Sequence, residues 1–311
     1  MCELLTVDSW RGWADSTFWA DKGPRGSMDF AGGEVVFCKI DEILSFFERL
    51  RLTRRRVVLV TGQGDFPCDP FRQSFLPGNV VQWFATNVTQ AHSRITALPL
   101  GLGSPSSPTT LTAGAISEAR RQSRPREKWL YVNFRPETNP AVRGPVFEMF
   151  RSRNEDWVTF QPPQDRGSNA GFLNAIMEHR FVLCPPGNGV DTHRMWEVLL
   201  AGAIPVVLRS RAMKPFESLP ILFVDDYREV TQAFLQNAWT RIQVPEETPK
   251  MMYADYWGKK IAEARQALKG REQMGLAEWM GDSARYGVGM IRRRFQDFRR
   301  CGRKKWSFFL A

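Results

Sequence analysis

Short hydrophobic runs alternate with amphipathic stretches along most of the chain. Residues 57–62 form a run rich in β-branched side chains that ends in glycine, which is typical of a buried parallel strand. From Ile40 to Leu50, apolar residues recur every three or four positions, as on one face of a helix. Strands that alternate with helices predict βαβ units and therefore parallel sheets.

The same pattern predicts the remaining elements. Strands are expected over 34–38, 57–62, 80–86, 95–98, 129–134, 157–160, 181–184, 204–208 and 221–224. Helices are expected over 40–50, 142–150, 170–178, 192–201 and 228–239. The stretch 104–128 is rich first in Ser and Pro and then in Arg and Ala, which indicates a connection with at most a short exposed helix.

Two strand–helix series joined by a connection predict an α/β protein of two Rossmann-like domains with parallel sheets that face each other across a cleft. We expect an N-terminal domain over 1–115 and a C-terminal domain over 129–280, with a helix over 281–311 completing the first domain. In such sheets, ligands bind at the carboxyl ends of the strands.

The segment 179–197 is the densest in polar groups that follow a predicted strand. Glycines in its loop allow a ligand to approach the backbone, and the free amides at the start of the next helix favour an anion. Arg194 could bind phosphate oxygens, and Glu197, one turn later, could accept hydrogen bonds from ribose hydroxyls. The candidate ligands of this segment are Pro186, Gly187, Asn188, Gly189, Asp191, His193, Arg194 and Glu197. Spacing alone fits a glycine and proline turn before a solvated helix equally well.

The order of these residues resembles a known family. The segments 180–185, 187–189, 191–194, 196–197 and 202–207 are similar to the signature block of exostosin-like glycosyltransferases, and 131–134 and 219–225 extend the similarity. In the first half, 60–62, 83–87 and 98–102 are also similar to that group. The resemblance implies a GT-B fold, with a nucleotide sugar on the C-terminal domain and the acceptor mainly on the N-terminal domain. It also implies inversion at the anomeric carbon, with a UDP-sugar as the favoured donor.

The donor site is expected to work without a metal or any further cofactor. The chain has no Asp-x-Asp triplet, the usual manganese-binding element of the other main glycosyltransferase fold. The leaving diphosphate would then be stabilised by cations and helix-terminal amides. Arg194 and Arg135 are the candidates, and Asn133 lies beside Arg135 at the end of the same predicted strand. Arg135 could equally be a surface arginine, and His193 could pack locally instead of binding the donor.

An inverting transfer needs a general base that deprotonates the acceptor hydroxyl. Asp65 is the candidate because it follows the strand 57–62 at its carboxyl end. A turn aspartate with no catalytic role is the alternative, since Asp is common in turns. Asp69 and His92 are weaker candidates.

Charge changes this picture little. The chain of 311 residues has 43 Lys and Arg against 33 Asp and Glu, a net charge of +10. Residues 281–311 hold nine of the cations and two of the acids, so most of the excess lies there. Apolar residues at helical spacing make this tail amphipathic, which suggests either peripheral contact with a membrane or a closing helix packed on the N-terminal domain.

Other classes of function remain as alternatives. A nucleic-acid-binding protein would need basic residues interleaved with a recognition element, and the sequence has none, so no nucleic acid is expected as a partner. A retaining glycosyltransferase and a non-catalytic nucleotide-sugar binder stay open. Five cysteines without a Cys-x-x-Cys pair and three histidines predict no metal centre. Acidic residues break the first 30 positions, and no apolar run approaches the ~20 residues of a membrane span, so a cytoplasmic protein is expected.

Overall fold

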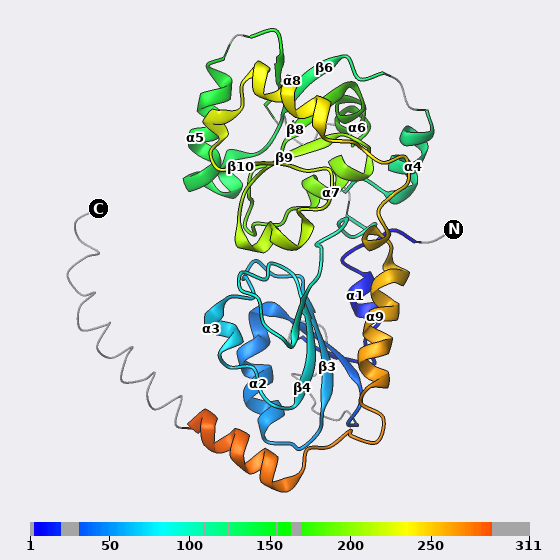
Figure 1. Ribbon diagram of the computed structural model, residues 1–311, viewed down its shortest axis with the longest axis vertical. Helices are drawn as coiled ribbons and strands as arrows, with labels where there is room; N and C mark the ends of the chain where they lie inside the picture. Colours follow the sequence, from blue (N-terminus) through cyan, green and yellow to red (C-terminus); the bar gives the residue numbers. More distant parts are fainter. Residues whose placement is uncertain are drawn as a thin grey trace, which may run out of the picture.

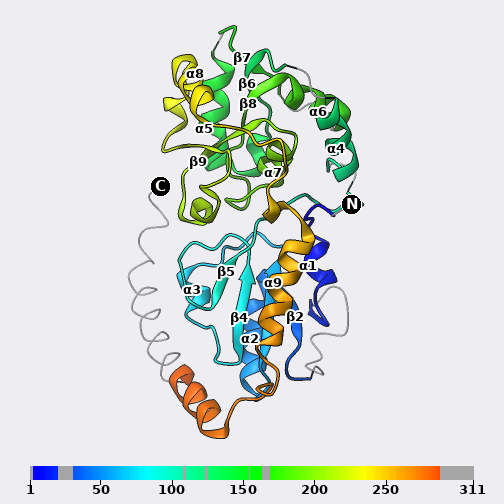
Figure 2. The same ribbon diagram turned by 45° about the vertical axis from the view of Figure 1, so that its right-hand side comes forward.

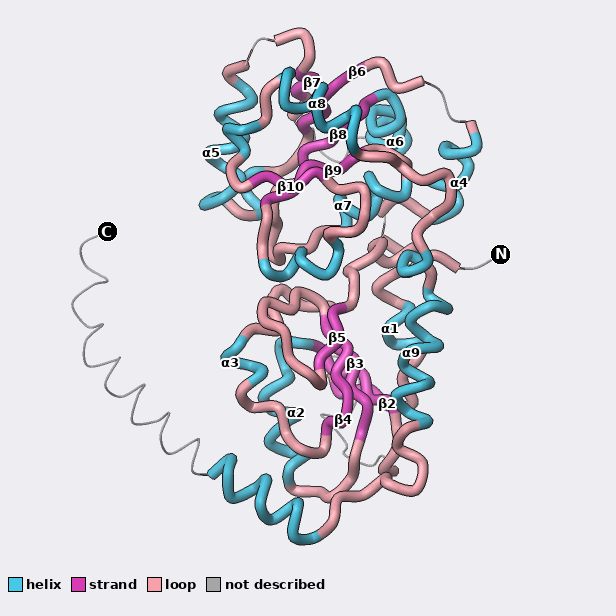
Figure 3. Tube along the Cα trace, in the orientation of Figure 1, coloured by secondary structure: helices cyan, strands magenta, loops and turns pink. Residues whose placement is uncertain are grey.

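The structure, a computed structural model, describes residues 3–19, 31–107, 110–122, 125–153, 155–162 and 169–287. The chain forms two lobes, each built around one five-stranded parallel sheet with helices packed against it (Figure 1, Figure 3). The predicted fold class, two Rossmann-like α/β domains with parallel sheets, is confirmed. The first domain is the lower lobe of Figure 1, and the second domain is the upper lobe.

The first sheet has its strands in chain order, and all neighbours are parallel. Its strands are β1 (Ser16–Phe18), β2 (Val35–Lys39), β3 (Val57–Gly62), β4 (Val80–Ala85) and β5 (Ile95–Ala97). Successive residues of a strand point to opposite faces, so Val57 and Leu59 join one hydrophobic cluster, and Val58 and Val60 join another.

A sheet whose parallel strands follow chain order has its right-handed crossovers on one face. Helices α2 (Ile43–Arg51) and α3 (Pro70–Gln73) connect the strands on that side. The other face is covered by α1 (Ser9–Gly12) and by α9 (Ala254–Gln266), as Figure 2 shows. Trp257 and Ile261 of α9 pack against Val58 and Val60 of β3. The chain therefore returns to the first domain at α9, earlier than the return at residue 281 that the sequence predicts.

The second sheet has the order β10-β9-β8-β6-β7. Its strands are β6 (Lys128–Val132), β7 (Val158–Phe160), β8 (His179–Leu183), β9 (Ile204–Leu208) and β10 (Leu222–Val224). Helices cover both faces: α4 (Ala113–Arg121), α6 (Asn169–Glu178) and α7 (His193–Leu200) on one, α5 (Pro140–Arg151) and α8 (Gln232–Arg241) on the other. The winding direction reverses between β6 and β8, which makes the carboxyl ends of these two strands a topological switch point.

The connection between the domains is more structured than the sequence suggests. Helix α4 begins at a cap in which the Thr112 hydroxyl accepts from the Ala115 amide, and Ile116 is buried against the second domain. Arg120 donates to the carbonyl of Leu200, 3.2 Å away. The helix predicted here as short and exposed is thus part of the second domain.

The backbone crosses between the domains in three places that lie side by side. The amide of Leu5 donates to the carbonyl of Met252 at 2.7 Å, and the amide of Val7 donates to the carbonyl of Leu102 at 3.0 Å. Leu4 packs into the core of the second domain, while Leu5 packs into the core of the first. The N-terminal segment, the segment after β5 and the segment before α9 therefore form one joint between the lobes.

A helix over 276–287 follows α9 and packs on the first domain (Figure 1). Arg51 pairs with Asp282 at 2.7 Å, and Arg56 pairs with Glu278 at 2.6 Å. The rest of the basic tail, including 292–311, lies outside the described residues, so membrane contact there stays a prediction. In the described part of the chain, no helix has both the length and the apolar character that crossing a membrane requires.

Candidate active site

A pocket of about 440 Å³ lies between the two domains, at the carboxyl ends of their strands. The first domain contributes loops after β2, β3 and β4, and the second contributes the loop after β8 and the start of α7. Its lining includes Val7, Lys39, Asp41, Gln63, Gly64, Asp65, Asn87, Leu100, Thr138, Arg143, Gly187, Asn188, Gly189, Asp191, Thr192 and His193. Six of the residues singled out from the sequence therefore meet at this pocket: Asp65, Gly187, Asn188, Gly189, Asp191 and His193.

Arg143 holds together the two loops at the switch point of the second sheet. Its guanidinium donates to the carbonyls of Pro186 at 2.8 Å, Pro185 at 3.0 Å and Arg135 at 3.1 Å. The first two carbonyls belong to the loop after β8, and the third belongs to the loop after β6. Burial lowers the pKa of Arg143 to about 10, so the side chain stays a cation at neutral pH. A cation inside the crevice thus fixes the backbone that would contact a ligand.

The glycine loop leads into a helix start with free donors. The side-chain amide of Asn139 donates from Nδ2 to the carbonyl of Gly187 at 2.8 Å, which anchors the loop. The side chain of Thr192, the N-cap of α7, makes no cap hydrogen bond. The first amides of α7 therefore keep their capacity to bind an anion at the edge of the pocket.

His193 opens α7 and lines the pocket. Its Nδ1 lies 2.8 Å from the carbonyl of Gly101, and because a carbonyl only accepts, Nδ1 carries the proton. Burial lowers the pKa of His193, so the ring is neutral at neutral pH and Nε2 has a free lone pair. A neutral His193 can accept a hydrogen bond but adds no positive charge to the site.

The loops after β3 and β4 are hydrogen-bonded to the glycine loop across the pocket. The side-chain amide of Asn188 donates to Oδ2 of Asp65 at 3.2 Å. The backbone amide of Asp191 donates to Oδ1 of Asn87 at 2.9 Å. The glycine loop therefore contacts the loops that follow β3 and β4 directly, and Asp65 faces the glycine loop.

The side chain of Asp191 is committed to the joint between the domains. Its Oδ2 accepts from the amide of Leu100 at 2.8 Å, and its Oδ1 accepts from Nε1 of Trp196 at 2.6 Å. The residue is 3% exposed, and burial raises the pKa of its carboxyl group to about 7. Its role as a donor ligand stays a prediction, and these contacts give it a structural role as well.

The loops of the first domain carry backbone strain at the pocket. Gln63, directly after β3, has φ 55°, and Asn87, just after β4, has φ 52°. Left-handed backbone at residues other than glycine is uncommon and gathers at functional sites. At Gly64, a Cβ would lie 2.6 Å from Cγ2 of the buried Ile40, so a larger residue would force the packing here to shift. The close packing around this loop holds the strained backbone that presents Asp65.

The remaining predicted ligands lie around the pocket and do not line it. Arg194 donates to the backbone carbonyl of Asn133 and stacks over the ring of Phe172 at 4.7 Å. Arg135 is exposed beyond the end of β6. Glu197 is 7% exposed, and its Oε1 accepts from the amide of Leu111 at 3.3 Å. Their roles as donor ligands stay predictions, and the burial of Glu197 weighs against a contact with ribose.

Sequence reasoning missed several pocket residues. Lys39 ends β2 and lies 3.9 Å from Asp41, so the pocket has a cation and a second carboxylate beside Asp65. Both follow a predicted strand at its carboxyl end, which is a signal that could have found them. Arg143 gave no such signal, because an arginine in an amphipathic helix normally faces solvent. Among the residues described, no cluster of three or more His, Cys, Asp or Glu side chains could hold a metal ion.

Comparisons with known proteins find similar folds at low identity. No family model and no curated protein matches the chain. An α1,3-fucosyltransferase crystal structure has 14% identity and a TM-score of 0.45, with 80% of each chain covered. A UDP-forming α,α-trehalose-phosphate synthase from Burkholderia vietnamiensis has 12% identity and a TM-score of 0.37, over 78% of this chain and 69% of that one. A UDP-GlcNAc 2-epimerase from Methanocaldococcus jannaschii has 9% identity and a TM-score of 0.37, over 75% and 77%. Identities and TM-scores this low do not assign an activity to the chain.

Proposed function

We propose that the chain is an inverting glycosyltransferase that moves a sugar from a nucleotide sugar, with UDP as the favoured nucleotide, to a hydroxyl group of a glycan. One observation carries the proposal. The pocket between the domains joins a carboxylate at a strand end of the first domain, Asp65, to a glycine loop and helix start of the second, and Asn188 connects the two walls.

The donor would bind on the wall formed by the second domain. Its diphosphate would accept from the amides of the glycine loop and of the first turn of α7, where the helix dipole favours negative charge. Arg194 and Arg135 are the proposed cations, and Lys39 could approach the same charge from the first domain. These donors would stabilise the leaving diphosphate without a metal.

Asp65 would act as the general base toward the acceptor hydroxyl. Its side chain is exposed in the pocket, on the wall formed by the first domain, where the proposed acceptor would bind. Asp41 is a rival for the role, since it lines the same pocket. A base within hydrogen-bond reach of the acceptor typically accelerates such a step by about 10²–10⁴-fold.

The first test is a panel of nucleotide sugars with glycan acceptors, read by release of the nucleoside diphosphate. The anomeric configuration of the product, measured by NMR, then separates inversion from retention. Binding of a nucleotide sugar by calorimetry with no turnover on any acceptor would favour the non-catalytic binder.

The substitution Asp65→Asn tests the base. We expect turnover to fall about 10³-fold with little change in the affinity for the nucleoside diphosphate, because only the proton acceptor is lost. Asp69→Asn is the matched control, since Asp69 caps α3 through the amide of Arg72 and does not line the pocket. If Asp65→Asn turned over normally and Asp41→Asn did not, the role would pass to Asp41.

A further inference from the structure

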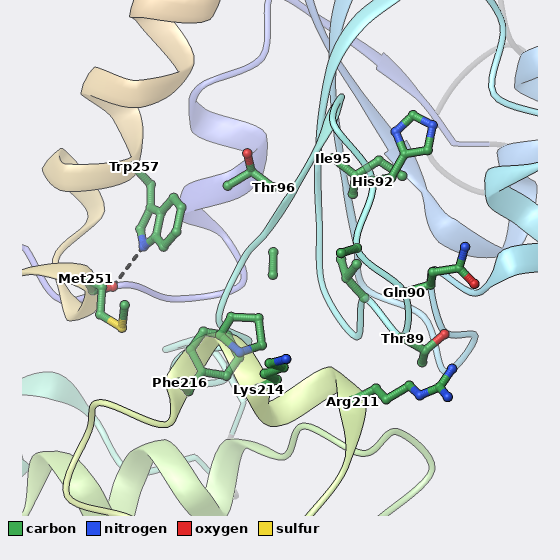
Figure 4. Close-up of a pocket in the computed structure, with 14 residues that line it drawn as sticks. Thr89, Gln90, His92, Ile95, Thr96, Arg211, Lys214, Phe216, Met251 and Trp257 are labelled. Carbon is green, nitrogen blue, oxygen red and sulfur yellow. Dashed lines mark hydrogen bonds between the residues drawn. The ribbon is translucent and has the colours of Figure 1, made fainter.

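A second and larger pocket lies between the same two domains, on the side of β5. Its volume is about 590 Å³, which is within the usual range for small-molecule sites. Figure 4 shows it between the β4–β5 loop of the first domain, the 3₁₀ helix η4 (Arg211–Phe216) of the second, and α9. It is lined by Val88, Thr89, Gln90, Ala91, His92, Ile95, Thr96, Ala97, Arg211, Lys214, Pro215, Phe216, Met251 and Trp257. Apart from His92, a weaker candidate for the base, none of the residues proposed above for the donor or for the base lies in it.

The charge of this pocket is positive. Arg211 and Lys214 extend from η4, and no Asp or Glu is among the lining residues. Both side chains are exposed, and neither has an ion pair or a side-chain hydrogen bond within the described residues. Two cations without a carboxylate partner favour an anion that can accept hydrogen bonds from both.

Apolar side chains from η4, α9 and β5 form the rest of the lining that the inference uses, and they are held in place. Phe216 is 2% exposed and packs edge-on against Trp196, with ring centroids 5.1 Å apart. Trp257 is 4% exposed, and its Nε1 donates to the carbonyl of Met251 at 2.8 Å. Ile95 lies on β5, the edge strand of the first sheet. These contacts keep an apolar wall in position without a ligand.

His92 does not add to the charge of the pocket. Its Nδ1 accepts from the amide of Arg94 at 3.1 Å, and burial and the nearby Arg94 lower its pKa. Arg94 itself donates to the carbonyls of Pro77 and Val80, and none of these three residues lines the pocket. The cationic part of the pocket is therefore confined to Arg211 and Lys214.

We infer that this pocket binds an amphipathic anion, a phosphate monoester attached to a hydrocarbon chain. The phosphate would accept from Arg211 and Lys214, and the hydrocarbon would lie against Phe216, Trp257 and Ile95. Such a ligand contacts both domains, because η4 belongs to the second and β5 to the first. The assignment rests on this pocket alone and does not depend on glycosyl transfer.

Calorimetric titration with the full chain tests the inference. The probes are octyl phosphate, butyl phosphate, inorganic phosphate and octyl glucoside, each below its micelle concentration. We expect octyl phosphate to bind at least tenfold more tightly than butyl phosphate, because each additional buried methylene contributes about 0.8 kcal/mol, and much more tightly than the other two probes. Equal binding of inorganic phosphate would overturn the inference in favour of a free-phosphate site, and equal binding of octyl glucoside would overturn it in favour of a neutral apolar pocket.

Variants locate the binding. The double substitution Arg211→Ala with Lys214→Ala should weaken octyl phosphate at least tenfold, while Ile95→Ser should weaken octyl phosphate several-fold and leave butyl phosphate nearly unchanged. Arg241→Ala with Lys259→Ala is the control, since both are exposed cations outside the lining. Thermal unfolding of each variant shows whether it folds. A dissociation constant within twofold of the wild type in the folded Arg211/Lys214 variant would contradict the assignment.

Discussion

The two domains use the same elements but wind them differently. The first sheet runs in chain order from β1 to β5, so its crossovers lie on one face, and the second face is closed by α9 from the far end of the chain. The second sheet reverses direction between β6 and β8, so its own helices cover both faces. The first domain thus takes part of its core from α9, and the second does not.

The difference also decides what each domain gives to the pocket. A reversal of winding leaves a crevice between two adjacent strand ends, and Arg143 holds the loops on either side of it. The first sheet has no reversal and presents only the loops that follow its strands, with strained backbone at Gln63 and Asn87. The second domain therefore contributes a crevice, and the first contributes individual side chains on the loops opposite it. This division fits the proposed function, in which the donor binds in the crevice and the acceptor approaches from the first domain.

The free energy of unfolding should depend on pH through Asp191, whose side chain joins the two domains. Because the folded-state pKa of Asp191 is raised from 3.8 to about 7, the unfolded chain binds fewer protons than the folded chain between about pH 4 and pH 7. This group therefore lowers the free energy of unfolding as pH rises through that window, by up to about 4 kcal/mol. In Asp191→Asn this dependence is absent, so the variant should gain stability relative to the wild type as pH rises.

Urea denaturation at several values from pH 4 to pH 7 measures that difference. Asp225→Asn is the control, because the side chain of Asp225 is 76% exposed. A constant difference between Asp191→Asn and the wild type across the window would mean that the carboxyl group is already ionised in the folded state.

Shortening a side chain on α9 tests whether the first domain depends on the C-terminal region. Ile261 is 2% exposed and packs on the face of the first sheet that α9 covers. Ile261→Ala should therefore lower the free energy of unfolding by about 3 kcal/mol. Lys259→Ala on the same helix is exposed and should change stability by less than about 0.5 kcal/mol. If denaturant titrations gave Ile261→Ala and Lys259→Ala the same free energy of unfolding, packing of α9 on the first sheet would not contribute to stability.

Loss of Arg143 tests the crevice of the second domain. Arg143→Ala leaves three carbonyls without their donor, so we expect a loss of about 2 kcal/mol in stability and a weaker donor complex, seen as a raised KM for the nucleotide sugar. Arg151→Ala, at the exposed end of the same helix, is the matched control. An unchanged KM in the folded Arg143→Ala variant would separate the crevice from donor binding.

The local pattern of hydrophobic and polar residues predicts most of the strands and helices. The runs 57–62 and 204–208 are strands with the predicted bounds, because β-branched residues between turn signals fit a buried, pleated sheet. Strand β1 was missed because it has three residues and little hydrophobic pattern. Helix α9 was not predicted, because the sheet that its apolar face covers lies some 200 positions earlier in the chain.

The site was predictable only in part. The glycine loop was found because glycines, a strand end and a helix start are neighbours in the sequence. The burial of Glu197 and the engagement of Asp191 were not, because their partners, Leu111 and Leu100, come from the segment between the domains. Residues that bind a ligand and residues that join two domains share the same polar chemistry, and only the tertiary contacts separate them.

The joint of three segments between the lobes limits where the chain can be cut into separately expressed fragments. A fragment that begins near residue 125 contains every strand of the second sheet but lacks Leu4 and Leu102, which pack in that domain's core. A fragment that ends near residue 110 contains every strand of the first sheet but lacks α9. Neither half can be expressed alone as a complete folding unit, and co-expression of two fragments would have to rebuild the joint between them.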